Sequence, residues 1–351
     1  MPSFQKIVSR VTESRWSKLY VATACLQAIV IIVLQVAILL QNTQEAQELP
    51  DALPIGTTTS SADVLDQAAV RFRNIKWENL AFCGFQVWFL GMAFDATVYQ
   101  NTAEILALAV LNGFCALLGA FEIVDGVIWI KRIGADVNVV PLSVARNIEI
   151  GLTCAILLFA CVFAYLSLAM VRQFGWNIYK KIGADIRIQR MYRTFQFFVL
   201  ALKIDLFFEF MVSVFYCIQF GLRSGITGET GIQLVVTILL MPMLYFSRMA
   251  CSAESIGQMI TCICFQGFVV VHFSLILHQT FVPNNNWYVW ICLVWLGIAL
   301  TVATSVLGAM CLRNFEKGLK PFVQRGRNKS SQKDLEMNTQ KTIDEWKIDD
   351  I

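Results

Sequence analysis

Long apolar runs alternate with shorter polar segments along the whole chain. A transmembrane helix needs about 20 mostly apolar residues, and eight stretches meet that need. They are residues 19–41, 79–99, 103–125, 149–173, 195–220, 231–249, 256–280 and 287–312. The pattern therefore predicts an all-α fold, a polytopic transmembrane helix bundle of about eight spans.

Two junctions between these spans are unusually short. The second and third spans are separated only by a turn around Tyr99–Thr102, which predicts a tight helical hairpin. The residues from Arg248 to Glu254 leave just enough chain for a turn between the sixth and seventh spans. The remaining connections are longer and polar.

Lysine and arginine set the expected orientation. They gather in the N-terminus 1–18, in the loop 174–194 and in the tail 313–351. Eight spans place all three segments on one side, which the positive-inside rule assigns to the cytosol, so both termini are expected to be cytosolic. The loop 42–78, acidic in its first part, then falls in the lumen. The loop 126–148 is the exception, because it carries three basic residues on the luminal side.

Composition supports a membrane protein and excludes several other classes. Of the 351 residues, 57% are hydrophobic and 15% are charged, whereas soluble domains carry about 25% charged residues. A net charge of +3 without a basic face or zinc pattern argues against nucleic-acid binding. All eleven cysteines lie in or beside apolar segments, so no disulfide framework is expected. The organisation is a bundle over 19–312, with a mostly disordered tail beyond it.

No pattern in the chain indicates an enzyme. The sequence contains no nucleophile elbow, phosphate loop or metalloprotease helix, and it has only two histidines. We therefore expect no catalytic residues, no metal site and no cofactor.

Three charged residues interrupt the fifth span: Lys203, Asp205 and Glu209. Charges inside a membrane are costly and are functional candidates by default. Asp205 and Glu209 share a helix face, and two carboxylates in a low dielectric cannot both ionise cheaply, so one is protonated or a cation lies between them. One interpretation is a proton- or cation-coupled site. The other is structural, with the carboxylates bonded to neighbouring helices and Lys203 extended to the cytosolic interface. Asp95 and Glu104 lie near span ends, and no role is predicted for them.

A second group of candidates falls toward the luminal side. Glu122 and Asp125 end the third span, and His272 and His278, the only histidines, lie in the seventh. A carboxylate–histidine cluster would suit pH sensing or metal capture in a mildly acidic lumen. The alternative is interfacial charges plus isolated histidines, since nothing in the sequence brings these helices together.

The loop 174–194 is basic and aromatic, and its candidate binding residues are Trp176, Lys180, Lys181, Arg187, Arg190 and Arg193. Its apolar residues Ile186, Ile188 and Met191 are placed to face lipid while the basic side chains meet anionic headgroups of the cytosolic leaflet. The same segment suits a protein partner, or it only fixes the topology.

Three motifs join this loop to the charged span. Phe-Gly-Trp-x-x-Tyr-Lys-Lys-Ile-Gly-Ala-Asp begins at Phe174, Arg-Met-Tyr-Arg-Thr-Phe-Gln at Arg190, and Leu-Lys-Ile-Asp-Leu-Phe-Phe at Leu202. Together they resemble an uncharacterised family of fungal Golgi apparatus multi-pass membrane proteins. The basic N-terminus, the order of the spans and the basic tail are similar as well, so the resemblance covers most of the chain. It implies a Golgi membrane protein of unassigned activity and supplies no catalytic residues. Ile204 stands where the family favours Phe.

Two functions from different classes remain open. The first is a Golgi or endomembrane transporter, or a lipid- or cargo-handling factor, working through the carboxylates of the fifth span. The second is a non-transporting scaffold or trafficking adaptor, working through the loop 174–194 and the tail. A transporter needs Asp205 and Glu209 to face a water-accessible cavity, and an adaptor does not.

Overall fold

The computed structural model describes residues 4–12, 14–48, 59–133, 140–182, 186–216, 228–281 and 288–317. Within these residues the chain is entirely helical apart from short turns. The helices are α1 (Phe4–Thr12), α2 (Arg15–Glu48), α3 (Thr59–Tyr99), α4 (Thr102–Ile133), α5 (Val140–Ile182), α6 (Ile186–Tyr216), α7 (Gly228–Ala253), α8 (Ile256–Phe281) and α9 (Tyr288–Leu312). The all-α prediction is therefore confirmed.

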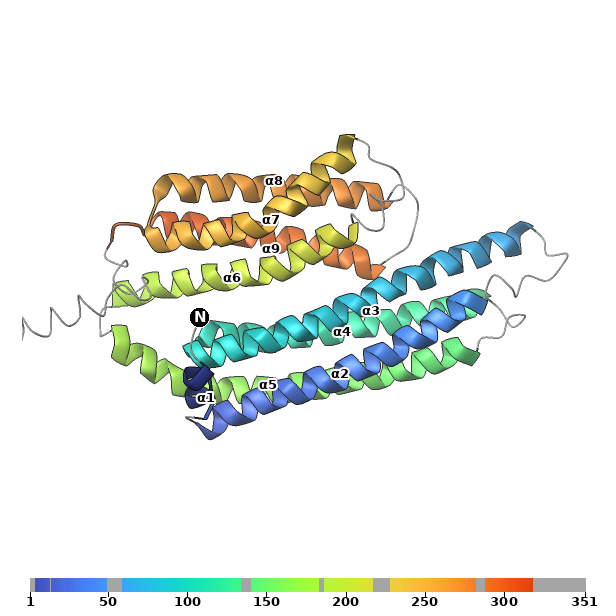
Figure 1. Cartoon of the computed structure of the whole chain (residues 1–351), viewed down its shortest axis with the longest axis horizontal. Coiled ribbons are helices and arrows are strands. Elements are labelled where there is room, and N and C mark those ends of the chain that lie inside the picture. Colours follow the sequence, from blue (N-terminus) through green and yellow to red (C-terminus); the bar gives the residue numbers. More distant parts are fainter. Residues whose placement is uncertain are drawn as a thin grey trace, which may run out of the picture.

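The long helices form two four-helix halves that lie side by side (Figure 1). Helices α2 to α5 pack against one another in the first half, and α6 to α9 in the second. The halves meet mainly where α3 and α4 approach α6 and where α4 approaches α9. The short helix α1 lies against α2 and α3.

The two ends of the bundle are distinct. At the Arg15 end, where α2 begins, Ser14 Oγ donates a hydrogen bond to Gln173 Oε1 near the end of α5, at 2.9 Å. Helix α9 also finishes at this end, whereas α3 and α9 both begin at the opposite end, called here the Trp290 end (Figure 1). The first and last long helices thus bring the chain back to the end from which it started.

Among the described residues, seven helices are long and apolar enough to cross a membrane: Arg15–Thr43, Ile75–Tyr99, Thr102–Ile128, Ser143–Phe174, Gly231–Ala253, Ile256–Thr280 and Trp290–Leu312. They coincide with seven of the eight expected spans. Helix α6 is the exception because Lys203, Asp205 and Glu209 follow three arginines, so no 18-residue stretch of it has fewer than three charges. It nevertheless lies alongside the other long helices (Figure 1).

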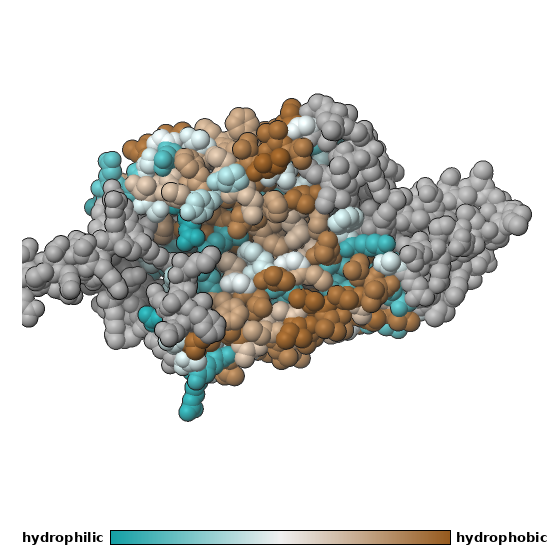
Figure 2. Space-filling view, viewed as in Figure 1, coloured by the Kyte–Doolittle hydropathy of each residue, from teal (hydrophilic) through white to brown (hydrophobic). Residues whose placement is uncertain are grey.

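The outward faces of the helices are apolar. In α2, Ile29, Val33 and Leu40 are each more than half exposed, and hydrophobic side chains are spread over the coloured middle of both halves in Figure 2. Apolar surface on this scale is typical of contact with lipid, and helices satisfy their own backbone hydrogen bonds there. The chain is a multi-pass membrane protein.

Both short junctions are tight turns, as predicted. Helix α3 ends at Tyr99, Gln100 takes a φ of 53°, and Asn101 caps α4 through a 3.2 Å hydrogen bond from the Ala103 N–H to its side chain. At the second junction, Glu254 takes a φ of 54° between α7 and α8.

The segments expected as loops are more helical than the hydropathy pattern indicated. Helices α2 and α3 extend into 42–78, α4 and α5 into 126–148, and α5 and α6 into 174–194. Polar residues can continue the helix of an apolar span beyond the membrane. The hydropathy pattern does not reveal this extension, because it marks only where the apolar stretch ends. The tail beyond 317 lies outside the described residues, so its expected disorder stays a prediction.

Candidate functional site

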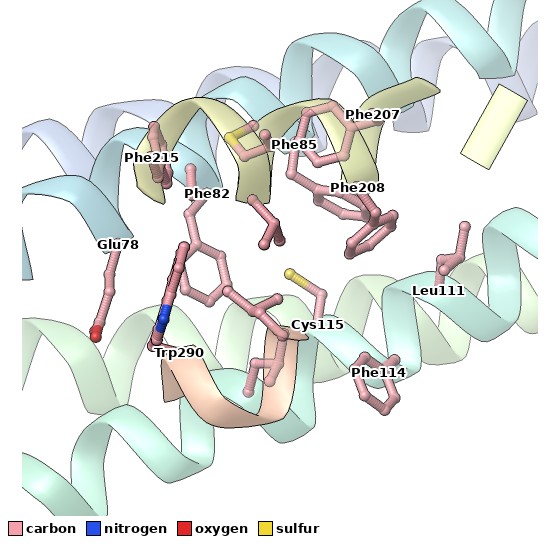
Figure 3. A pocket seen from close by; sticks show the side chains of 15 residues that line it. Glu78, Phe82, Phe85, Leu111, Phe114, Cys115, Phe207, Phe208, Phe215 and Trp290 are labelled. Carbon is pink, nitrogen blue, oxygen red and sulfur yellow. The ribbon is translucent and has the colours of Figure 1, made fainter. Parts of the chain in front are cut away.

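A cavity lies between the two halves and reaches toward the Trp290 end (Figure 3). The volume of the cavity is about 60 Å³. Its lining comes from α3, α4, α6 and α9: Glu78, Ala81, Phe82, Phe85, Leu111, Phe114, Cys115, Leu118, Phe207, Phe208, Met211, Val212, Phe215, Trp290 and Leu293. Both halves therefore contribute to one apolar site.

Aromatic rings form the wall where α3 meets α6. Trp88 stacks on Phe207 with ring centroids 5.2 Å apart, and Phe85 contacts both Phe207 and Phe208. Such ring pairs contribute about 0.5–1.5 kcal/mol beyond the area that they bury. The rings hold the halves together beside the cavity and give it an apolar lining.

One end of the cavity carries a carboxylate. Glu78 is 4% exposed, and it lies beside Trp290 in the close-up view (Figure 3). The Trp290 indole N–H donates to Thr280 Oγ1 at 3.2 Å. Every other residue that lines the cavity is apolar or aromatic.

A cluster of charges links the halves on the Arg15 side of this cavity. Lys203 of α6 forms ion pairs with Asp95 of α3 and Glu104 of α4. Glu104 Oε1 also accepts a 2.8 Å hydrogen bond from Asn101 Nδ2 in the α3–α4 turn. The ammonium of Lys203 is held by two carboxylates for which the sequence suggested no role. The expectation that Lys203 reaches the cytosolic interface stays a prediction.

Asp205 and Glu209 lie on a different face of α6, in its contact with α9. Thr304 Oγ1 donates to Asp205 Oδ2, and Thr301 Oγ1 donates to Glu209 Oε1 at 2.8 Å. Both carboxylates are 0% exposed, and neither lines the cavity between the halves. The arrangement is that of carboxylates bonded to a neighbouring helix, and their proposed role in transport stays untested.

The luminal candidates are distributed over both halves. Glu122 and Asp125 are buried on α4, whereas His272 is buried on α8, with its Nε2 3.2 Å from Ser213 Oγ of α6. His278 is exposed near the end of α8. Within the described part of the chain, no group of three His, Cys, Asp or Glu side chains is placed to hold a metal ion.

The basic segment 174–194 straddles the junction of α5 and α6. Arg187, Arg190 and Arg193 are exposed on the first turns of α6. Met191 is 5% exposed and packs near Tyr192, so the prediction that it faces lipid is wrong. Trp176, Lys180 and Lys181 belong to the last turns of α5, and their side chains lie outside the described residues.

Sequence reasoning located the charged span but missed the cavity. The cavity depends on which faces of α3, α4, α6 and α9 meet, and hydropathy does not encode that choice. A usable signal was present in Phe82 and Phe85 of α3 and in Phe208 and Phe215 of α6, because each pair recurs at helical spacing.

These features define a multi-pass helical membrane protein with an apolar site between two four-helix halves. The chain is similar to a protein of the fission yeast Schizosaccharomyces pombe described as a UPF0658 Golgi apparatus membrane protein, with 26% identity over 209 residues. The match covers 56% of this chain and spans 55% of the yeast protein, little more than half of each. It confirms the resemblance inferred from the motifs. No family model and no solved structure matches the chain.

Proposed function

We propose that this chain is a Golgi membrane protein, with both termini in the cytosol, that binds a lipid or another apolar cargo between its two halves. The observation that carries the proposal is the apolar cavity lined by α3, α4, α6 and α9. Concave, mostly apolar sites with few polar groups are typical of ligand binding, and interfaces between structural units are common places for them. The proposal assigns no enzymatic activity and no cofactor.

The Golgi location is supported by the similarity to the yeast Golgi apparatus membrane protein. A fluorescent fusion of the full chain is expected to coincide with a Golgi marker. A fusion confined to the plasma membrane or the mitochondria would contradict this part of the proposal.

Photo-crosslinking tests lipid binding directly. The purified full chain in lipid nanodiscs is exposed to a neutral long-chain alcohol carrying a diazirine, and labelled peptides are mapped by mass spectrometry. We expect labels on cavity residues of α3, α4 and α6. Ala81→Phe should fill the cavity and reduce this labelling severalfold, because Ala81 lines it. Leu80→Phe is the matched control, since Leu80 is 48% exposed on the outer face of the same helix. Equal labelling of both variants would refute binding in the cavity.

The working role of the carboxylates is tested in the same assay. Because Asp205 and Glu209 do not line the cavity, the double change Asp205→Asn with Glu209→Gln should leave its labelling unchanged. The amide side chains are similar in shape to the carboxylates, and their oxygens still accept hydrogen bonds from the hydroxyl groups of Thr304 and Thr301. Lost labelling in a well-folded double variant would instead support the interpretation in which these carboxylates drive transport.

A second candidate function is a scaffold or trafficking adaptor. It is favoured by the exposure of Arg187, Arg190 and Arg193 on adjacent turns of α6, which suits anionic lipid headgroups or an acidic protein partner. Changing Lys180, Lys181, Arg187 and Arg190 to Ala should then reproduce the cellular phenotype of a strain that lacks the protein. The same variant should leave cavity labelling intact. The opposite result would favour ligand handling in the cavity.

A further inference from the structure

We propose that the second half of the bundle binds a hard divalent cation of the class of Ca²⁺, Mg²⁺ or Mn²⁺. Asp205 and Glu209 of α6 bind the ion together with the amide oxygen of Gln266 of α8. None of these three residues lines the cavity, so the inference is independent of lipid binding there. The sequence predicted no metal site, because the ligands come from helices that are far apart in the chain.

The core of the second half contains more hydrogen-bond acceptors than its hydroxyl groups can supply with hydrogens. Asp205 and Glu209 are 0% exposed, and each accepts a hydrogen bond from one threonine of α9. Their other oxygens, Asp205 Oδ1 and Glu209 Oε2, have no hydrogen-bond partner among the described residues. The Thr301 hydroxyl lies 2.8 Å from both Glu209 Oε1 and the Gly297 carbonyl oxygen, so two acceptors share its one hydrogen. Buried carboxylates supplied with so few hydrogens are costly unless a cation compensates their charge.

Gln266 brings a further acceptor to the same level of the bundle. It is 4% exposed, and its Oε1 likewise has no hydrogen-bond partner in the described part of the chain. Helices α6 and α8 run in the same direction (Figure 1), and their side chains meet where His272 Nε2 lies 3.2 Å from Ser213 Oγ. Gln266 precedes this contact by six residues on α8, whereas Glu209 and Asp205 precede it by four and eight on α6. The amide therefore lies at a height between those of the two carboxylates.

The contacts between α8 and α9 give the same register. A Cβ added to Gly308 would lie 3.4 Å from Ile263, and a Cβ added to Gly297 would lie 3.2 Å from Phe273. Gln266 falls between the two α8 residues, and the two threonines that hold the carboxylates fall between the two glycines of α9. Three helices thus present oxygen atoms at one level of the core.

Charge and ligand type select the ion. The carboxylates carry two negative charges, and Lys203, the nearest basic residue along α6, is paired with carboxylates of α3 and α4 instead. A divalent cation neutralises both charges, whereas a monovalent one leaves a charge buried without compensation. Carboxylate and amide oxygens are ligands of Ca²⁺, Mg²⁺ and Mn²⁺ rather than of softer metals. With only two carboxylates, the set agrees with the lack of any described group of three His, Cys, Asp or Glu side chains suited to a metal.

Binding is measured on the full chain in detergent after removal of metals with a chelator. The chloride of Ca²⁺, Mg²⁺ or Mn²⁺ is added at constant pH and ionic strength, and the unfolding temperature is recorded. At about 100 times the dissociation constant, at least one of these ions should raise the unfolding temperature by about 5 °C. NaCl should not. Equilibrium dialysis with the most effective ion should then find a single ion bound per chain.

Three variants locate the bound ion. Asp205→Asn with Glu209→Gln should abolish both the temperature shift and the bound ion, because the amides carry no charge. Without metal this variant should unfold no earlier than the wild type, since two buried charges are gone. Gln266→Leu removes a ligand and should weaken binding by about tenfold or more. Gln233→Leu is the matched control, because Gln233 is also buried in this half but bonds Gln279 toward the other end of α8.

The outcomes decide the assignment. Binding that persists in the double variant would show only an adventitious ion elsewhere on the chain and would overturn the site. An equal shift with NaCl would refute the divalent ion. If the wild type is stabilised by lower pH but by none of the three ions, the carboxylates take up protons instead and the inference fails. If the double variant does not fold, Gln266→Leu decides, and an affinity equal to that of Gln233→Leu would overturn the site. Lipid labelling of the cavity is unaffected by any of these results.

Discussion

Lys203 connects three helices from both halves of the molecule. Its side chain is 17% exposed, whereas that of Glu104 is 2% exposed and that of Asp95 is 36% exposed. A buried ion pair gains attraction in a low dielectric but must offset the cost of leaving water. Because the ammonium bonds carboxylates of α3 and α4 at once, this cluster fixes how α6 sits on the first half.

Removing the ammonium should therefore destabilise the fold. Breaking a buried pair by deleting one partner costs about 3–5 kcal/mol, and the partial exposure of Lys203 and Asp95 reduces the expected loss for Lys203→Met to about 2–3 kcal/mol. The measurement is the unfolding temperature in detergent, with Lys18→Met at an exposed position as control. Adding Glu104→Gln should restore part of the loss. If Lys203→Met melted like the control, the cluster would contribute nothing to stability.

The sequence singled out the charged residues of α6 as candidates, but it did not predict the residues with which they pair. Asp95 and Glu104 fall near span ends, where a carboxylate is ordinarily solvated, so nothing in the one-dimensional pattern distinguished them from surface charges. Their role appears only when the α3–α4 turn is placed against α6. The pairing of Asp205 with Thr304, and of Glu209 with Thr301, likewise required the register of two helices about 100 residues apart.

At the scale of the element, helix positions were well predicted and helix packing was not. The expected spans lie within α2 to α9 wherever the chain is described, because crossing a bilayer requires a long apolar stretch whatever the neighbours. Packing depends on individual small residues. Gly119 of α4 faces α5 so closely that an added Cβ would lie 2.8 Å from Thr153 Oγ1, whereas Gly113 on the same helix has no such neighbour within 4 Å.

These two glycines make a matched pair of variants. Gly119→Ile should push α4 away from α5 and destabilise the first half by about 1–3 kcal/mol, as overpacking does. Gly113→Ile adds the same side chain to the same helix in open space and should leave the unfolding temperature close to that of the wild type. Comparing the two in detergent cancels the helix propensity of isoleucine. Equal unfolding temperatures would show that α4 and α5 are free to separate at this contact.

At the scale of the whole molecule, the number of spans decides on which side each end lies. In the part of the chain that the structure describes, seven helices satisfy the length and composition expected of a span. An odd number of spans would place the two ends of the chain on opposite sides. Helix α2 begins and α9 ends at the same end of the bundle (Figure 1). We infer that α6 is the eighth span and that its charges are accommodated by protein contacts with α3, α4 and α9, since charged residues inside a membrane normally face the interior of a bundle.

A glycosylation test checks this topology. Gly56→Asn creates an acceptor sequence, because Thr58 follows two residues later, and position 56 is well separated in sequence from the spans that end at Thr43 and begin at Ile75. If the segment is luminal, the variant should gain one glycan that an endoglycosidase removes. The natural acceptor Asn328-Lys329-Ser330 in the tail is the internal control and should stay unmodified on the cytosolic side.

Each alternative topology gives a different pattern of glycans. Modification at both Asn328 and the introduced site would put the tail in the lumen, leaving an odd number of spans and removing α6 from the membrane. Modification at Asn328 alone would invert the whole bundle. No glycan at either site would place both segments in the cytosol and contradict the luminal position of 42–78. Only a glycan at the introduced site alone agrees with eight spans and two cytosolic termini, and it would place the Trp290 end of the bundle on the luminal side.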